Sequence, residues 1–252
     1  MKYFIDTEFL EGIQKETFPI NLFRKETKPT IDLISIGIVA EDGREYYAIS
    51  KDFNLKEAWN RFEWKQRSKE DIEITPALGS LYKDYWIRDN VLKPIFYEWM
   101  NKDINFHHYD EHFTYKNFKM LINKYGKTNK QIAEEVKGFT LQYNWVIDGI
   151  STATNKPYTV PQFYGYYCDY DWVVFCWLFG RMIDLPKGFP MYCIDLKQEL
   201  ERLNETLGYN CDVKGCSYRL QEKPNYPIQT NTHNALADAR WNKQLYEFLN
   251  KL

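Results

Sequence analysis

The stretch KYFIDTEFLE (residues 2–11) joins a short apolar run to two acids, Asp6 and Glu8, that stand one residue apart. In an extended strand, residues i and i+2 point to the same side. The stretch therefore predicts a short buried strand over residues 2–6 with two like charges side by side at its end. Taken alone, such a pair indicates either a strand end that reaches solvent or two ligands of a shared divalent cation, which would remove their repulsion.

The next segments favour further strands. The run IDLISIGIVA (residues 31–40) is rich in Ile and Val, which are typical of strands, and Asp42-Gly43 is a hairpin turn signal followed by EYYAIS. We expect the first three strands to form an antiparallel meander. Residues 12–30 are polar, contain two prolines and are expected to form a loop.

The rest of the chain alternates between helical and strand patterns. The helices are expected at 85–100 (with a kink or break at Pro94), at a short segment ending at Gly126, at 128–140 (ending at Gly138), and at 169–182, 196–208 and 233–252. Further strands are expected at 160–168 and 190–195. This order predicts one mixed α/β domain with helices on a central sheet.

Composition limits the class of protein. The chain has 252 residues, a formal net charge of −2 and a pI of about 6.1, so a polyanionic partner would need a local basic patch or metal ions. Its five cysteines form no CxxC pair, which argues against a disulfide framework or a zinc site. No apolar leader and no apolar run long enough for a membrane helix is present, and we expect a reduced, soluble, cytoplasmic protein without a membrane partner.

Three more groups could join Asp6 and Glu8. DYDWVVFCWLFG supplies Asp169 and Asp171 at a strand-to-helix junction, where acids also serve as helix caps. HNALADARW supplies His233 and Asp238 at the start of the last helix, where a cap and a surface acid are the alternative. His233 would suit a general base, because the pKa of histidine ordinarily lies near neutrality.

The set Asp-x-Glu, a later Asp, and His-x4-Asp resembles the DEDDh 3′–5′ exonuclease superfamily, which has the ribonuclease H-like fold. YFIDTEFLE resembles its first motif, CDYDWVVFCWLFG its second and HNALADAR its third. Together with IDLISIGIVAEDGREYYAIS and WIRDNVL, these segments are similar to the ribonuclease AS family of exoribonucleases that prefer polyadenylate. The similarity spans residues 1–10, 31–53, 85–96 and 130–240.

The resemblance implies a function and a set of site residues. Asp6, Glu8, Asp171 and Asp238 would hold two Mg²⁺ or Mn²⁺ ions, with Asp169 as the alternative to Asp171, and His233 would be the general base. The enzyme would release nucleoside 5′-monophosphates from the 3′ ends of single-stranded RNA. The resemblance also suggests a homodimer. A DNA exonuclease and a nucleic-acid-binding module without catalysis remain alternatives.

Some features depart from the family or stay open. Residues 11–30 and 97–129 are expected to be insertions in a single exonuclease domain over residues 1–252, which leaves the base preference open. Phe9 and Leu10 would contact the terminal base, as similar positions do in the superfamily, with core packing as the alternative. His107, His108 and His112 lack a third metal ligand, so a transition-metal site there is disfavoured.

Three segments combine cations with aromatic residues: RFEWKQRSK (61–69), HHYDEHF (107–113) and YKNFK (115–119). Such segments are found in grooves that bind single-stranded nucleic acid by stacking and backbone contacts. They are also common on ordinary solvated surfaces, and that reading is favoured for each segment.

Overall fold

The computed structural model describes residues 1–14, 28–67, 80–102, 112–141, 146–147, 150–151, 160–208 and 219–252. His107 and His108, considered above as metal ligands, lie outside the described residues. The chain divides into two compact units: unit 1 comprises Met1–Phe9, Ile31–Asp52 and Gly126–Leu252, and unit 2 comprises Leu10–Thr30 and Phe53–Tyr125. The single domain with insertions remains a prediction.

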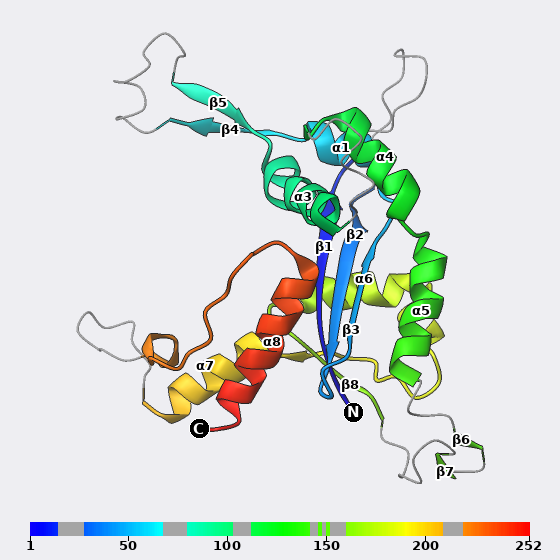
Figure 1. The fold of residues 1–252 in the computed structure, drawn as a ribbon. Helices are drawn as coiled ribbons and strands as arrows, with labels where there is room; N and C mark the ends of the chain where they lie inside the picture. The colour runs from blue at the N-terminus through cyan, green and yellow to red at the C-terminus, as the bar shows by residue number, and fades with distance from the viewer. Residues whose placement is uncertain are drawn as a thin grey trace. The chain divides into compact units, whose positions relative to one another are not determined.

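Unit 1 is built on a five-stranded mixed sheet with the strand order β3-β2-β1-β8-β9 (Figure 1). Its strands are β1 (Lys2–Gly12), β2 (Thr30–Ala40), β3 (Glu45–Ile49), β8 (Gln162–Gly165) and β9 (Ile194–Asp195). The β2–β3 pair is antiparallel, while β1 with β8 and β8 with β9 are parallel pairs. The α/β class predicted from the sequence is confirmed.

The arrangement predicted for the first three strands needs correction. An antiparallel hairpin joins β2 to β3, with Gly43 in the turn at φ 90°. Of the first three strands, β2 and β3 form the antiparallel pair that the structure describes, whereas β1, in the middle of the sheet, pairs in parallel with β8. The reason is the position of β8, because a strand that returns after a helical crossover can add to β1 in parallel. The first strand also runs to Gly12 and does not end at residue 6.

Helices cover both faces of this sheet (Figure 1). Tyr3 and Ile5 pack with residues of α5 and α6 in one core, whereas Phe4 packs with residues of α7 and α8 in another. This is the period-2 alternation of a strand that is buried on both faces. The four helices are α5 (Asn129–Leu141), α6 (Asp169–Leu178), α7 (Leu196–Thr206) and α8 (Ala235–Leu249).

The helix ends follow local side-chain chemistry. The hydroxyl of Thr128 accepts a hydrogen bond from the Gln131 N–H at the start of α5, and Asp195 accepts bonds from Lys197 and Gln198 at the start of α7. The predicted end of the first of these helices at Gly138 was wrong, because α5 continues to Leu141. A single glycine weakens a helix but does not stop one that packs on a sheet.

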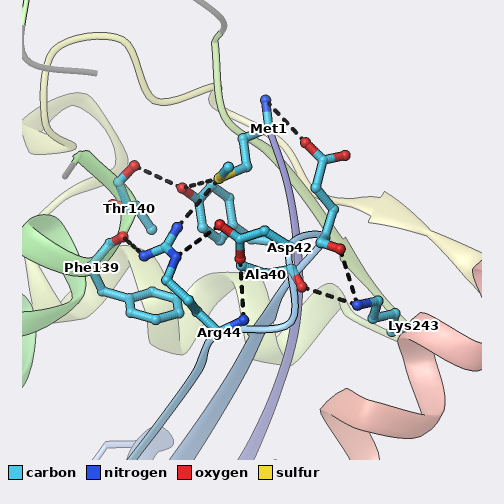
Figure 2. A network of polar contacts seen from close by, with 9 residues as sticks. Met1, Ala40, Asp42, Arg44, Phe139, Thr140 and Lys243 are labelled. Carbon is cyan, nitrogen blue, oxygen red and sulfur yellow. Dashed lines mark hydrogen bonds and ion pairs between the residues drawn. The ribbon is translucent and has the colours of Figure 1, made fainter. Parts of the chain in front are cut away.

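A polar network fastens the β2–β3 hairpin to its surroundings (Figure 2). The guanidinium of Arg44 donates to Asp42 within the turn and to the carbonyl oxygen of Phe139 near the end of α5. Lys243 of α8 donates to the carbonyl oxygens of Ala40 and Glu41. The hairpin is thereby held to a helix on each face of the sheet.

Unit 2 contains helices and a small antiparallel sheet. Its elements are α1 (Leu55–Asn60), β4 (Glu63–Gln66), β5 (Leu81–Asp84), α3 (Lys93–Lys102) and α4 (Tyr115–Tyr125). A π-helical segment, Arg88–Leu92, leads directly into α3, which contains Pro94. Pro94 has no N–H to donate, and the change of helix type lies directly before it. The predicted break does not occur at Pro94, because α3 continues through it to Lys102, and a kink there stays a prediction. Within the described chain, no helix combines the length and the apolar character needed to cross a membrane.

Candidate active site

Three carboxylates of unit 1 converge at β1. Asp6 and Glu8 lie on this strand and Asp238 lies in the first turn of α8. One oxygen of each side chain lies within 4.8 Å of the others. Alternation along β1 puts Asp6 and Glu8 on the same face as Phe4, which is the face that α8 covers. The like-charged pair in the sequence is therefore one side of a three-acid cluster, not a solvated strand end, and Glu8 is only 9% exposed.

The start of α8 fixes the position of Asp238. Asn234 is the N-cap, and its side-chain oxygen accepts a hydrogen bond from the Ala237 N–H at 3.0 Å. One turn beyond Asp238, the buried amide of Asn242 donates to the carbonyl oxygen of Ile5 at 2.9 Å. The helix is thereby bound to the residue that precedes Asp6. The alternative of His233 as a cap and Asp238 as a surface acid is not what the structure shows, since Asp238 is buried.

His233 is joined to the cluster through its backbone. Its N–H donates to Oδ2 of Asp238 at 2.9 Å, and its φ is 65°, in the left-handed region that few residues other than glycine adopt. The other oxygen of Asp238 accepts a hydrogen bond of 2.6 Å from Nε2 of Gln229. Asp238 is thus held from both sides, and His233 is held next to it in an uncommon conformation.

Asp171 reaches β1 from the other face of the sheet. It lies in the first turn of α6, and its Oδ1 accepts hydrogen bonds from the N–H of Thr7 (2.8 Å) and the hydroxyl of Thr7 (2.6 Å). Asp171 is not one of the three clustered acids, yet its charge raises the pKa of both Asp6 and Glu8. Asp169 is exposed, so of the two acids of this motif Asp171 is the one that contacts β1, and its role in a site stays a prediction.

The surroundings of the four acids favour the protonated, neutral form of each carboxyl group. Burial, then the charges of Asp238 and Asp171, raises the pKa of Glu8 to about 8. Burial and the neighbouring acids also raise the pKa of Asp6 well above its ordinary value. Burial raises the pKa of Asp171 to about 6 even though the bonds from Thr7 oppose this, and burial raises the pKa of Asp238 as well.

This cluster has the donor set that a hard divalent cation prefers. All its ligand atoms are carboxylate oxygens, which suit Mg²⁺ and Mn²⁺. Within the described part of the chain, no Lys or Arg forms an ion pair with any of the four acids. A cation bound among them would offset the repulsion that raises their pKa values.

The two apolar candidates differ in exposure. Phe9 is partly exposed and makes an edge contact with the ring of Tyr170, with centroids 5.9 Å apart. Leu10 is fully buried, which favours the alternative of core packing for this residue. Contact of either side chain with a terminal base stays a prediction.

Two residues that bond directly to the acids were missing from the sequence-based set, Thr7 and Gln229. Thr7 lies between Asp6 and Glu8, and the same alternation that pairs the acids sends Thr7 to the side of α6. This position could have been derived had both helices been placed. Gln229 lies in an irregular polar stretch before α8, where no periodicity marks a residue for this role.

Comparison with known proteins shows which proteins this chain is similar to. No family model matches the chain. Two proteins of Mycobacterium tuberculosis, from strains CDC 1551 and H37Rv, are each 26% identical to it over 240 residues, covering 95% of this chain and 88% of theirs. Both are named 3′-5′ exoribonuclease. The similarity covers most of the chain and extends through both units.

Proposed function

We propose that this chain is a metal-dependent 3′–5′ exoribonuclease that removes nucleoside 5′-monophosphates from single-stranded RNA. The observation that carries the proposal is the convergence of Asp6, Glu8 and Asp238, with oxygens within 4.8 Å of one another. These acids come from opposite ends of the chain, and none has a cationic partner from Lys or Arg in the described residues. The names of the two relatives supply the reaction class.

Asp6, Glu8 and Asp238 would hold two Mg²⁺ or Mn²⁺ ions together with Asp171. Bound there, the ions would supply Lewis acidity that activates water and offsets negative charge at the phosphate. Asp6 would be the central residue of this ligand set, because the charges of all three other acids act on it.

His233 would act as the general base of the hydrolysis. An imidazole nitrogen takes a proton from the attacking water as its oxygen bonds to phosphorus, and the bond from phosphorus to the 3′ oxygen breaks. The leaving 3′ oxygen takes a proton from solvent water and becomes the new 3′ hydroxyl of the shortened strand, and His233 returns its proton to solvent. The released nucleotide keeps the 5′ phosphate. The bond from the His233 N–H to Asp238 ties the position of the base to that of a metal ligand.

The test is a nuclease assay on 5′-labelled single-stranded oligonucleotides of each base, as RNA and as DNA, with Mg²⁺, Mn²⁺ or EDTA. We expect stepwise shortening of RNA from the 3′ end, lost in EDTA and in Asp6→Asn. His233→Ala should also lose activity but keep the rise in melting temperature on Mn²⁺ addition, because it removes a base and leaves the acids in place. Glu45→Gln, on the exposed surface, is the matched control.

The assay also separates the alternatives. Equal shortening of DNA would replace the ribonuclease assignment by a general exonuclease with the same chemistry. Binding of the oligonucleotides without cleavage in either metal would refute the enzyme and leave a binding module on the same fold. Faster shortening of oligoadenylate than of the other RNAs would support the base preference that the resemblance implies.

A further inference from the structure

The two-stranded sheet of unit 2 exposes aromatic side chains. Every residue of β4 is exposed, and Trp64 retains 60% of its surface. In the antiparallel register Trp64 lies opposite Lys83, and directly paired residues share one face of a sheet. Phe62, two residues before Trp64, belongs to the same face. A patch of several exposed apolar side chains on a protein surface often marks an interaction site.

The side chains of this face form one continuous surface, here called the aromatic face: Phe62, Trp64, Lys83 and Tyr85. The ring of Phe62 lies 5.6 Å from that of Trp64 and 5.7 Å from that of Tyr85, centroid to centroid. Nζ of Lys83 lies 4.3 Å from the centroid of Phe62 and 5.5 Å from that of Trp64. The aromatic face therefore presents a ring surface with a cation on it.

The opposite face of the same hairpin is different. Its paired residues include Glu63 and Asp84, and Lys65 forms an ion pair with Asp84. Tyr82 is the aromatic residue of this side and is 42% exposed. If the hairpin only had to be solvated, its aromatic side chains would not need to be concentrated on one face.

Charge indicates what the aromatic face binds. Residues 61–67 and 81–88 together contain five Lys or Arg and two acids, in a chain whose net charge is −2. The hairpin is thus a local cationic region, which is complementary to a polyanion. Stacked rings next to cations are the combination by which proteins bind single-stranded nucleic acid without reading its sequence.

We propose that the aromatic face binds single-stranded nucleic acid, with a base stacked on Trp64 and a phosphate paired with Lys83. This surface lies in residues of unit 2 and shares none with the acid cluster of unit 1. Only the expectation that RNA is its natural occupant rests on the proposed function. The geometry of rings and cation holds for any single strand.

Binding is measured by fluorescence anisotropy of a labelled oligouridylate of about 12 nucleotides. This length lies within the range of about 4–16 nucleotides that single-strand-binding folds such as the OB fold contact. The buffer contains EDTA, so that no cleavage occurs and no metal ion at the acid cluster attracts the strand. We expect Trp64→Ala to weaken binding by about 5- to 100-fold. The logarithm of the binding constant falls linearly with the logarithm of the salt concentration. Lys83→Gln should make this slope less steep by about 0.7, the value for one phosphate contact with a single strand.

Tyr82→Ala is the matched control, because it removes an exposed ring from the opposite face of the same hairpin and should change affinity less than twofold. Circular dichroism melting of each variant checks that the fold is intact. Equal affinity of wild type and Trp64→Ala would overturn the proposal. The proposal would also be overturned if sedimentation shows that Trp64→Ala converts a dimer to a monomer while the affinity for the oligonucleotide stays unchanged. The aromatic face would then be an interface between two copies of this chain.

The outcome can be told apart from failure of the proposed nuclease. Asp6→Asn should bind the oligonucleotide as wild type does, because the aromatic face contains no acid of the cluster. Shortening of RNA by the wild type in Mn²⁺, together with equal affinities of wild type and Trp64→Ala in EDTA, would support the nuclease and refute the binding surface. Binding in EDTA that depends on Trp64, without any cleavage in metal, would support the binding surface and refute the nuclease.

Discussion

A Cβ atom on Gly37 would lie 2.2 Å from the carbonyl oxygen of Ala235. Gly37 is in the middle of β2, and Ala235 is the first residue of α8, three residues before Asp238. The helix start rests directly on the backbone of the sheet at this point. The absence of a side chain at Gly37 is therefore a condition for the position of Asp238.

We predict that Gly37→Ala impairs both folding and activity. The added methyl meets backbone atoms of Ala235 and Leu236, which cannot rotate away, so the start of α8 must move. Overpacking of this kind costs about 1–3 kcal/mol of stability. Displacement of Asp238 should lower the cleavage rate by about tenfold or more. Urea denaturation and the RNA shortening assay measure the two effects.

Gly138→Ala is the control for this substitution. Gly138 lies within α5, and nothing lies within 4 Å of the position its Cβ would take. Alanine favours a helix over glycine by about 0.5–1 kcal/mol, so this variant should be slightly more stable and fully active. Equal behaviour of the two variants would contradict the role assigned to Gly37.

The two acids of α6 give a second prediction. Asp171 is buried and bonded to Thr7, whereas Asp169 is exposed two residues earlier. Asp171→Asn keeps the shape and removes the charge that acts on Asp6 and Glu8. We expect it to lower activity by about 100-fold or more and to weaken Mn²⁺ binding measured by calorimetry.

Asp169→Asn should leave activity within about twofold of wild type, since an exposed charge in the first turn of a helix contributes little beyond its dipole interaction. The reverse result, with Asp169 essential and Asp171 dispensable, would assign the motif to the other acid. Thr7→Val should share part of the Asp171 defect and Thr7→Ser should not, because serine keeps the hydroxyl that donates to Oδ1.

The raised pKa values predict how stability depends on pH without metal. The pKa of Glu8 rises from 4.5 in the unfolded chain to about 8 in the folded protein, so between these values the folded state holds a proton that the unfolded chain has released. Stability in EDTA should therefore fall as the pH rises through this window. Asp171, with its pKa raised to about 6, adds to the lower part of the decline.

Melting temperatures from about pH 5 to pH 8 in EDTA and in Mg²⁺ measure this decline. If Mg²⁺ binds the ionised carboxylates as proposed, it should flatten or reverse this decline. Glu8→Gln should flatten it in EDTA, while Glu45→Gln should not, since Glu45 is paired with Arg240 and its pKa is lowered. A melting temperature that stays constant across the window in EDTA would show that the cluster carries no such penalty.

Much of the site could be derived from alternation in a single strand. The spacing of Asp6 and Glu8 predicts that they share a face, and the structure confirms that they converge with a third acid. The same rule implies that Thr7 faces the other way. The sequence could not show which helix covers which face, because that depends on the parallel addition of β8 to β1 and not on any local pattern.

Element boundaries were harder to predict where tertiary packing decides them. β1 continues past the acids to Gly12, and α5 continues past Gly138. In both cases the local signal for an ending was present, but pairing or burial extended the element beyond it. Close contacts such as that between Gly37 and Ala235 join residues far apart in the sequence and leave no periodic trace.

Gln229 supplies the last prediction, because its Nε2 donates to Oδ1 of Asp238 at 2.6 Å. Gln229→Ala should weaken Mn²⁺ binding by about tenfold, the usual effect of losing a group that orients a metal ligand. Gln229→Glu should lower the melting temperature in EDTA. The decrease should grow as the pH rises, because the substitution adds a fifth carboxylate next to Asp238 and increases the repulsion. Ile228→Ala, at the exposed neighbouring residue, is the control and should change neither quantity. Calorimetric Mn²⁺ affinities for Gln229→Ala equal to wild type would mean that Asp238 is held in place by the His233 N–H and the helix alone.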